Sequence, residues 1–173
     1  MARTKLISND EVRLHSIAKA SFDVNKFSIH IIPAQEEYIM GFLGEDLFNE
    51  LIEQTEADTL TDENIELLDD YIKPALAWFV LHKALPFIHS DISNVGVQSG
   101  NTEFSNSSAS KERADLMSMC LNNGNTLLGT AERFLKNNEG TYPLYDNATD
   151  IDTATEIIGG IILDEDEGGT VYE

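Results

Sequence analysis

The chain has 173 residues, of which 42% are hydrophobic, and this is enough for one domain with a hydrophobic core. It carries 31 acidic and 11 basic side chains, so its formal net charge at pH 7 is -20. Such a charge repels phosphate backbones and disfavours direct binding of DNA or RNA through a basic surface. The single cysteine excludes an internal disulfide, and no apolar run is long enough to predict a signal peptide or a membrane span.

The first predicted elements are a short helix and an extended segment. An S-x-x-E capping box at Ser8 predicts a helix that ends near Ala20. From Phe22 to Ile32, apolar and polar residues alternate, which is typical of a short extended stretch. Pro33 then suits the first position of the next helix, where its missing N–H costs nothing. The apolar residues that follow the capping box with roughly helical spacing are Val12, Leu14 and Ile17.

Three helical segments are predicted between Ile32 and Pro86, with almost no loop between them. Gly44 suits a left-handed C-cap at a sharp corner between the first two, and Thr61 can cap the third. Because the third helix is apolar on two opposite sides, we expect it to be covered on both and to lie at the centre of the fold. Pro74 should kink or break it. The two apolar sets are Ile65, Leu68, Ile72, Leu76 and Phe79, and Leu67, Tyr71, Trp78, Leu81 and Leu85.

The composition changes at residues 93–107, which are rich in Gly, Ser and Asn. This segment predicts an exposed loop or a small hairpin, with Val95 and Val97 as its strand-like part. A long helix over about residues 108–138 follows. Gly124 falls in the middle of its apolar arc, which indicates either a close crossing with another helix or a tolerated weak spot, and the sequence favours neither.

The end of the chain is expected to behave differently from the rest. Residues 142–145 should return the chain to the core, and residues 146–173 form an acidic extended tail with nine acidic and no basic side chains. An apolar patch inside this tail should pair with something, either a neighbouring subunit or partner by strand addition, or its own domain. The candidate interface residues are Ile157, Ile158, Ile161, Ile162 and Leu163 of this patch, together with Val95 and Val97.

The sequence predicts no reaction centre, and we expect no enzymatic activity, cofactor or metal ion. None of the histidines lies four residues from another histidine or from the cysteine, as a zinc-binding helix requires. The motifs of phosphate-binding loops and serine hydrolases are absent from the sequence. The apolar spacing around Cys120 indicates a small core residue rather than a nucleophile. The four histidines are His15, His30, His82 and His89.

Four segments together resemble a known family. They are the runs IIPAQEEYIMGFLGEDLFNEL and DDYIKPALAWFVLHKALPFI, the start of the loop at Asn94–Val97, and FLKNNEGTYPLY at the end of the long helix. With these segments the chain resembles head–tail connector proteins, also called adaptor or ring proteins, of tailed bacteriophages. It is most similar to those of crAss-like and related phages of Bacteroidetes. The resemblance covers about residues 5–145 and rests on packing and turn residues.

The resemblance implies a mainly α fold, with a compact helical connector domain over residues 1–145. It implies a homo-oligomeric ring, commonly of twelve copies, below the portal protein in the neck of the virion. Such a ring extends the channel through which double-stranded DNA passes without sequence-specific binding, and it supports the next neck or tail ring protein. The protein would be in the host cytoplasm during assembly, with no role for a membrane. The alternative is an acidic binding module, such as a DNA mimic that presents carboxylates in place of phosphates.

Overall fold

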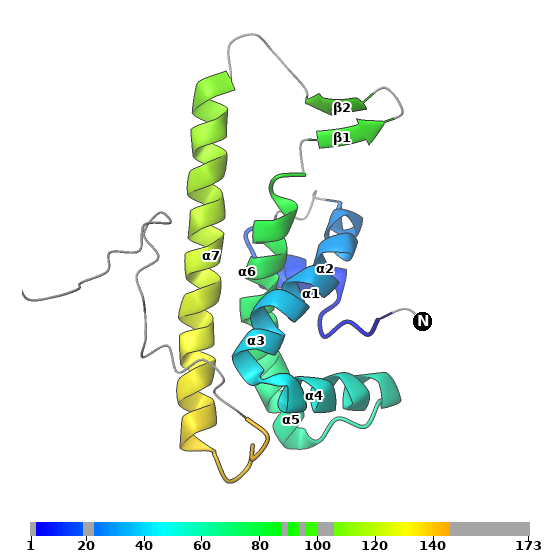
Figure 1. Cartoon of the computed structure of the whole chain (residues 1–173), viewed down its shortest axis with the longest axis vertical. Coiled ribbons are helices and arrows are strands. Elements are labelled where there is room, and N and C mark those ends of the chain that lie inside the picture. The colour runs from blue at the N-terminus through cyan, green and yellow to red at the C-terminus, as the bar shows by residue number, and fades with distance from the viewer. Residues whose placement is uncertain (1–2, 19–22, 88–89, 94–95, 100–105, 146–173) are drawn as a thin grey trace, which may run out of the picture.

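The computed structural model describes residues 3–18, 23–87, 90–93, 96–99 and 106–145, and these form a mainly α fold around one compact core (Figure 1). The predicted tail, residues 146–173, lies outside the described residues, as do Val95 and the candidate interface residues of the tail. In chain order the elements are α1 (Asn9–Leu14), η1 (Val24–Phe27), α2 (Ser28–Ala34), η2 (Gln35–Ile39), α3 (Met40–Leu43), α4 (Glu45–Ala57), α5 (Asp62–Glu66), η3 (Leu67–Ile72), α6 (Lys73–Ala84), β1 (Ser90–Ser93), β2 (Gly96–Ser99) and α7 (Asn106–Asn137).

Helix α1 begins at the predicted capping box and ends earlier than expected. The Glu11 backbone N–H donates to the Ser8 hydroxyl over 3.2 Å, and the Ser8 N–H donates to the Glu11 carboxylate over 2.8 Å. The helix ends at Leu14 instead of near Ala20, because the Ser16 hydroxyl accepts the Ala18 N–H in a local turn that competes with the helix. Leu14, the last residue of α1, is 76% exposed and Ile17 is 51% exposed, so the predicted apolar face is confirmed only at Val12.

The extended stretch predicted for residues 22–32 is wrong, because the described part of this segment is helical. A 3₁₀ turn, η1, leads directly into α2. Phe27 and Ile31 are fully buried, whereas Ile29 is 74% exposed, so the inward side chains recur every four residues rather than every two. Pro33 consequently lies inside α2 and not at its first position.

Two long helices contain a π-helical segment next to a proline. The first runs through α2, η2 and α3, with Pro33 just before η2, and the second runs through α5, η3 and α6, with Pro74 just after η3. A proline cannot donate the usual backbone bond, and a π-helical segment is one way in which a helix continues past such a defect. The predicted interruption at Pro74 is therefore confirmed. The predicted corner at Gly44 is also confirmed, since this residue has φ 81° between α3 and α4.

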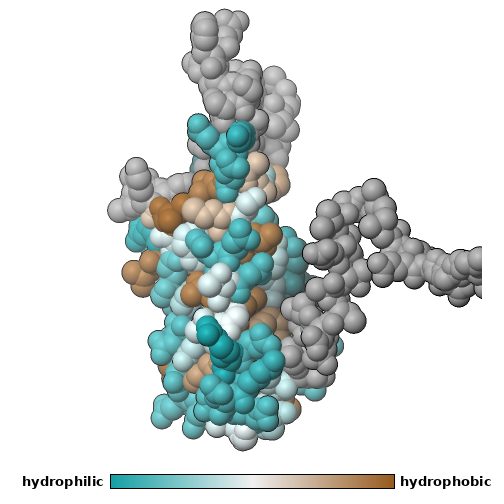
Figure 2. Space-filling model, turned by 90° about the vertical axis from the view of Figure 1, so that its left-hand side faces the viewer, coloured by the Kyte–Doolittle hydropathy of each residue, from teal (hydrophilic) through white to brown (hydrophobic). Residues whose placement is uncertain are grey.

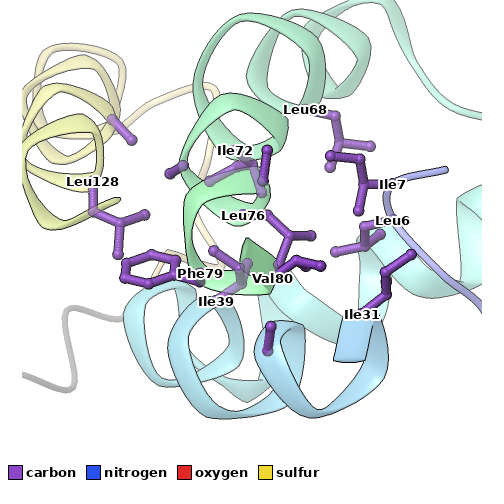
Figure 3. Packing of buried hydrophobic residues seen from close by; sticks show 14 of the residues in the cluster. Leu6, Ile7, Ile31, Ile39, Leu68, Ile72, Leu76, Phe79, Val80 and Leu128 are labelled. Carbon is purple, nitrogen blue, oxygen red and sulfur yellow. The ribbon is translucent and has the colours of Figure 1, made fainter. Parts of the chain in front are cut away.

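The second long helix, residues 62–84, lies at the centre of the core, as predicted, and we call it the central helix. The Thr61 hydroxyl caps it by accepting the Asn64 N–H over 3.2 Å. In Figure 3, Leu76 and Val80 lie toward Leu6 and Ile31, while Phe79 lies beside Leu128 of α7 on the other side. Both sides of this helix are therefore covered. Of the two predicted apolar sets, Ile65 departs from the expectation, because its side chain is 41% exposed.

An antiparallel pair of strands overlaps the start of the predicted loop or small hairpin, but it begins three residues earlier, so only Ser93 and β2 fall inside the predicted range 93–107. Residues 94, 95 and 100–105 of that range lie outside the described residues. The predicted long helix is present. Strands β1 and β2 are antiparallel, with Ser90 opposite Ser99 and Ser93 opposite Gly96. Helix α7 has 32 residues, which corresponds to a length of about 48 Å. It runs along one side of the molecule and packs against α6 and η3 (Figure 1). Within the described ranges, no helix combines the length and the apolar character needed to cross a membrane.

Candidate functional site

A metal site in the described residues would require several ligating side chains to converge on one point. No group of three or more histidine, cysteine, aspartate or glutamate side chains converges among them. His82 is held by the core, since its Nδ1 lies 3.0 Å from the carbonyl oxygen of Met117. The ring of His30 stacks on Phe87, and burial, followed by the charge of Lys83, lowers the pKa of His30. His89 lies outside the described residues.

Cys120 is a core residue, as predicted. Its side chain is fully buried on the side of α7 that faces α6 and η3. Burial raises the pKa of its thiol to about 11, so the reactive thiolate is scarce at neutral pH. A nucleophilic role is therefore disfavoured by both access and ionisation.

The buried polar side chains hold parts of the chain together. Gln35 is almost fully buried at the start of η2. Its side-chain oxygen accepts the Leu6 N–H over 3.1 Å, and its NH₂ group donates to the Thr4 carbonyl over 2.9 Å. Asn64 is also buried, and its NH₂ group donates to Glu50 and Gln54 of α4. Because these groups are used internally, we assign them a structural role.

Helices α6 and α7 approach each other closely at Gly124. A Cβ atom at this position would lie 2.6 Å from the Cε1 and Cζ atoms of Phe79. Of the two interpretations of Gly124, the close crossing is therefore correct. The segment after α7 also returns to the core as predicted, since the buried Tyr142 donates its hydroxyl to the Glu63 carbonyl over 2.7 Å. The position of α7 on the domain is thus fixed by specific contacts.

Charge is distributed very unevenly over the described surface. Residues 45–70, which include α4 and α5, carry eleven acidic and no basic side chains. All but Glu50 are exposed, and we call these exposed carboxylates the acidic flank. One of them, Asp69, is paired within the chain, with Lys73 at 2.6 Å. The members of the acidic flank are Glu45, Asp46, Glu53, Glu56, Asp58, Asp62, Glu63, Glu66, Asp69 and Asp70.

Helix α7 has the opposite character. It carries four basic and three acidic side chains, hence a net charge of +1, and residues 116–131 contain no charged side chain at all. Figure 2 shows this side of the molecule, where teal, pale and brown residues alternate and no single apolar patch dominates. We call its exposed residues between 118 and 136 the α7 outer face. Its members are Ser118, Met119, Asn122, Asn125, Thr126, Thr130, Arg133 and Lys136.

The predicted interface residues do not coincide with these two surfaces. Val97 lies in β2, where its backbone is opposite Ile92, and the other predicted interface residues lie outside the described residues. The acidic flank and the α7 outer face were not among the sequence-based predictions. Their signal was nevertheless present in the sequence as a 26-residue segment without a base and a 16-residue segment without any charge. The fold adds the information that the two segments form separate exposed surfaces.

Comparison with known proteins places this chain in a family without assigning an activity. A family model described as a family of unknown function, DUF6712, matches residues 39–155, which is more than half of the chain. No curated protein and no solved structure matches the chain significantly. The matched region includes both the acidic flank and α7, and it contributes no known reaction or ligand.

Proposed function

We propose that this chain, which belongs to the DUF6712 family of unknown function, is a structural protein of a virion. In this proposal it is a head–tail connector. Copies of the chain form a ring, commonly of twelve, below the portal protein and extend the channel for double-stranded DNA. The ring provides a platform for the next neck or tail ring protein. The protein therefore acts at the neck of the virion by contacts alone, after assembly in the host cytoplasm.

One observation carries the proposal beyond the sequence resemblance. The buried side chains of Gln35 and Asn64 are satisfied within the fold, and the exposed residues of α7 from Ser118 to Thr130 carry no charge. An exposed helix face of a protein with net charge -20 normally carries charge, because charge keeps such a face solvated. A charge-depleted face is typical of the central part of a protein–protein interface. These features support an assembly protein rather than an enzyme.

The experiment that tests the proposal is negative-stain electron microscopy of the full chain, alone and mixed with the portal protein of the same phage. We expect ring-shaped particles with a central channel, either free or only on the portal. A chain that remains a monomer or dimer and does not bind the portal would refute the proposal. A portal protein from an unrelated phage serves as the control for non-specific adsorption.

The candidate interface of the tail can be tested in the same assay. We expect a variant with Ser in place of the five tail residues of the candidate interface, Ile157, Ile158, Ile161, Ile162 and Leu163, to lose ring formation or portal binding. A matched variant with Ser in place of residues 164–167 removes four acidic side chains but leaves the apolar patch intact, and it should still assemble. If both variants assemble like the natural chain, the apolar patch is not an interface.

The acidic flank favours a second candidate, an acidic module that mimics DNA. Ten exposed carboxylates within 26 residues could occupy the basic groove of a nucleic-acid-binding protein. This function predicts a compact monomer or dimer and a complex that weakens steeply as the salt concentration rises. The connector predicts larger assemblies, so the size of the particles at low and high salt distinguishes the two candidates.

A further inference from the structure

We propose that the α7 outer face binds the acidic flank of a second copy of this chain, so that copies join head to tail. The inference rests on the proposed connector function, and it names the two surfaces that would form the ring. Neither surface is among the interface residues expected from the sequence. The partner is thus another molecule of the same protein, recognised through its carboxylates.

Electrostatics limits how two copies can approach each other. Each copy has a net charge of -20, so a contact between two acidic flanks would bring ten exposed carboxylates against ten others. Such a contact is strongly opposed at ordinary salt concentrations. The exposed part of α7 from Ser118 to Thr130 carries no charge. It is followed by Glu132, Arg133 and Lys136, of which Glu132 and Lys136 pair with each other at 2.7 Å. The α7 outer face is therefore a surface that an acidic flank can approach without this repulsion.

The chemistry of the α7 outer face suits carboxylates. The amide groups of Asn122 and Asn125 can donate hydrogen bonds to carboxylate oxygens, whereas the Thr126 hydroxyl already donates to the Asn122 carbonyl over 2.9 Å. Arg133 is exposed, and its guanidinium donates to Gly129 and Thr130 of its own helix, which holds it along the surface. A guanidinium binds a carboxylate with two parallel hydrogen bonds. The face thus combines neutral amide donors with the guanidinium of Arg133 near the end of the helix, where Lys136 is already paired with Glu132 at 2.7 Å.

The positions of the two surfaces allow a closed assembly. In Figure 1, α4 and the C-terminal part of α7 lie at the same end of the molecule, with the central helix between them. The part of the acidic flank on α4 therefore lies at a similar height to the C-terminal part of α7, on the other side of the central helix. A contact between two different surfaces of the same chain is heterologous, and it closes into a ring when each copy is rotated but not raised relative to the last. The arrangement favours a ring whose axis runs roughly along α7.

Cross-linking through introduced cysteines tests this contact directly. We combine Thr126→Cys on α7 with a cysteine at Glu53, Glu56 or Asp62 of the acidic flank, in three separate variants, and treat each full chain with a short bismaleimide. The natural chain is the control, because its only cysteine, Cys120, is buried. We expect a ladder of covalent oligomers beyond the dimer in at least one double variant. Chains with one introduced cysteine should give no ladder.

Three results would overturn the inference. The first is dimers from Thr126→Cys alone, which would indicate contact between two α7 helices. The second is dimers from an acidic-flank cysteine alone, which would indicate contact between two acidic flanks. The third is the absence of a ladder in all three double variants, free or on the portal. A ring seen on the portal without any ladder would refute these two surfaces and leave the connector function standing. A ladder from a chain that forms no ring and does not bind the portal would leave the two surfaces standing and refute the connector function.

A charge-reversal pair provides an independent test. We expect Arg133→Glu to weaken self-association about tenfold at low salt, because it replaces a favourable charge contact with a repulsive one. Lys26→Glu is the matched control, since Lys26 is exposed on η1, outside both surfaces, and the change in net charge is the same. Analytical ultracentrifugation measures the association of both variants. Equal weakening by the two substitutions would show that only net charge matters and would overturn the inference.

Discussion

The close packing of α6 and α7 predicts that one substitution has different effects at two glycines of α7. An alanine Cβ at Gly124 would lie 2.6 Å from two ring carbons of Phe79 and 2.9 Å from a third. Phe79 is fully buried, and its ring stacks on Tyr38 with the two ring centroids 4.1 Å apart, so the ring has little room to move aside. A Cβ at Gly129 meets no atom within 4 Å. The two positions thus differ mainly in the space beside the helix.

The expected effects follow from two opposing terms. Replacing glycine by alanine inside a helix stabilises a protein by about 0.5–1 kcal/mol. Adding a carbon atom to a filled core costs about 1–3 kcal/mol. Gly129→Ala should therefore raise the free energy of unfolding by up to about 1 kcal/mol. Gly124→Ala should leave it unchanged or lower it by up to about 2 kcal/mol, once the gain in helix propensity is subtracted.

Urea unfolding followed by far-UV circular dichroism measures both variants against the natural chain. The comparison is made at two protein concentrations, because Gly129 lies close to the α7 outer face and association would otherwise contribute. The double variant Phe79→Leu, Gly124→Ala should lose less free energy of unfolding than the sum of the losses of the two single variants, because the smaller Leu leaves room for the added Cβ. If Gly124→Ala stabilises the chain as much as Gly129→Ala, the two helices do not approach as closely as described.

Three further predictions concern single side chains. Gln35→Ala should lower the free energy of unfolding by about 1–3 kcal/mol, because it leaves the buried Leu6 N–H without an acceptor, and it should speed hydrogen exchange at that amide. Tyr142→Phe should cost about 1 kcal/mol in urea unfolding through loss of the bond to Glu63, and an unchanged midpoint would contradict this. Burial raises the pKa of the Cys120 thiol from 9.0 to about 11, so the unfolded chain loses this proton at a lower pH than the folded chain does. The contribution of the buried, protonated thiol to the free energy of unfolding is therefore full below pH 9 and falls as the pH rises toward 11. In urea unfolding below and above pH 9, the free energy of unfolding of a Cys120→Ala variant should fall less between the two pH values than that of the natural chain.

Features set by a few neighbouring residues were predicted correctly from the sequence. The capping box at Ser8, the cap at Thr61 and the positive φ of Gly44 each depend on local backbone chemistry, which side-chain type indicates directly. The long helix was also predicted, because a regular apolar arc over about 30 residues allows few alternatives. The prediction that Gly124 lies at a crossing was left open, since a glycine in an apolar arc has two explanations until its neighbour is known.

Two errors have physical causes that lie beyond local pattern. In the segment predicted to be extended, the alternation involves only a few residues, and Phe27 and Ile31 fit a helical spacing equally well. The exposure of Ile65 follows from η3, because a π-helical turn contains an extra residue and rotates everything before it by about 100° relative to a regular helix. The sequence indicated a break near Pro74 but not the kind of break. The face of the first turn was therefore assigned incorrectly.

The charge pattern and the core packing together explain why association would be directional. Acidic side chains cannot enter the core unpaired, so the central helix turns Asp69 and Asp70 outward while it buries Leu68 and Ile72. The same helix carries half of the acidic flank and lies between α4, which carries most of the rest, and α7. A molecule built this way opposes contacts between two acidic flanks and permits contacts between unlike surfaces. If the inference is correct, a high salt concentration should screen the repulsion between acidic flanks and make contacts between like surfaces possible. The ordered head-to-tail ladder should then give way to a mixture that includes dimers cross-linked between two copies of the same introduced cysteine.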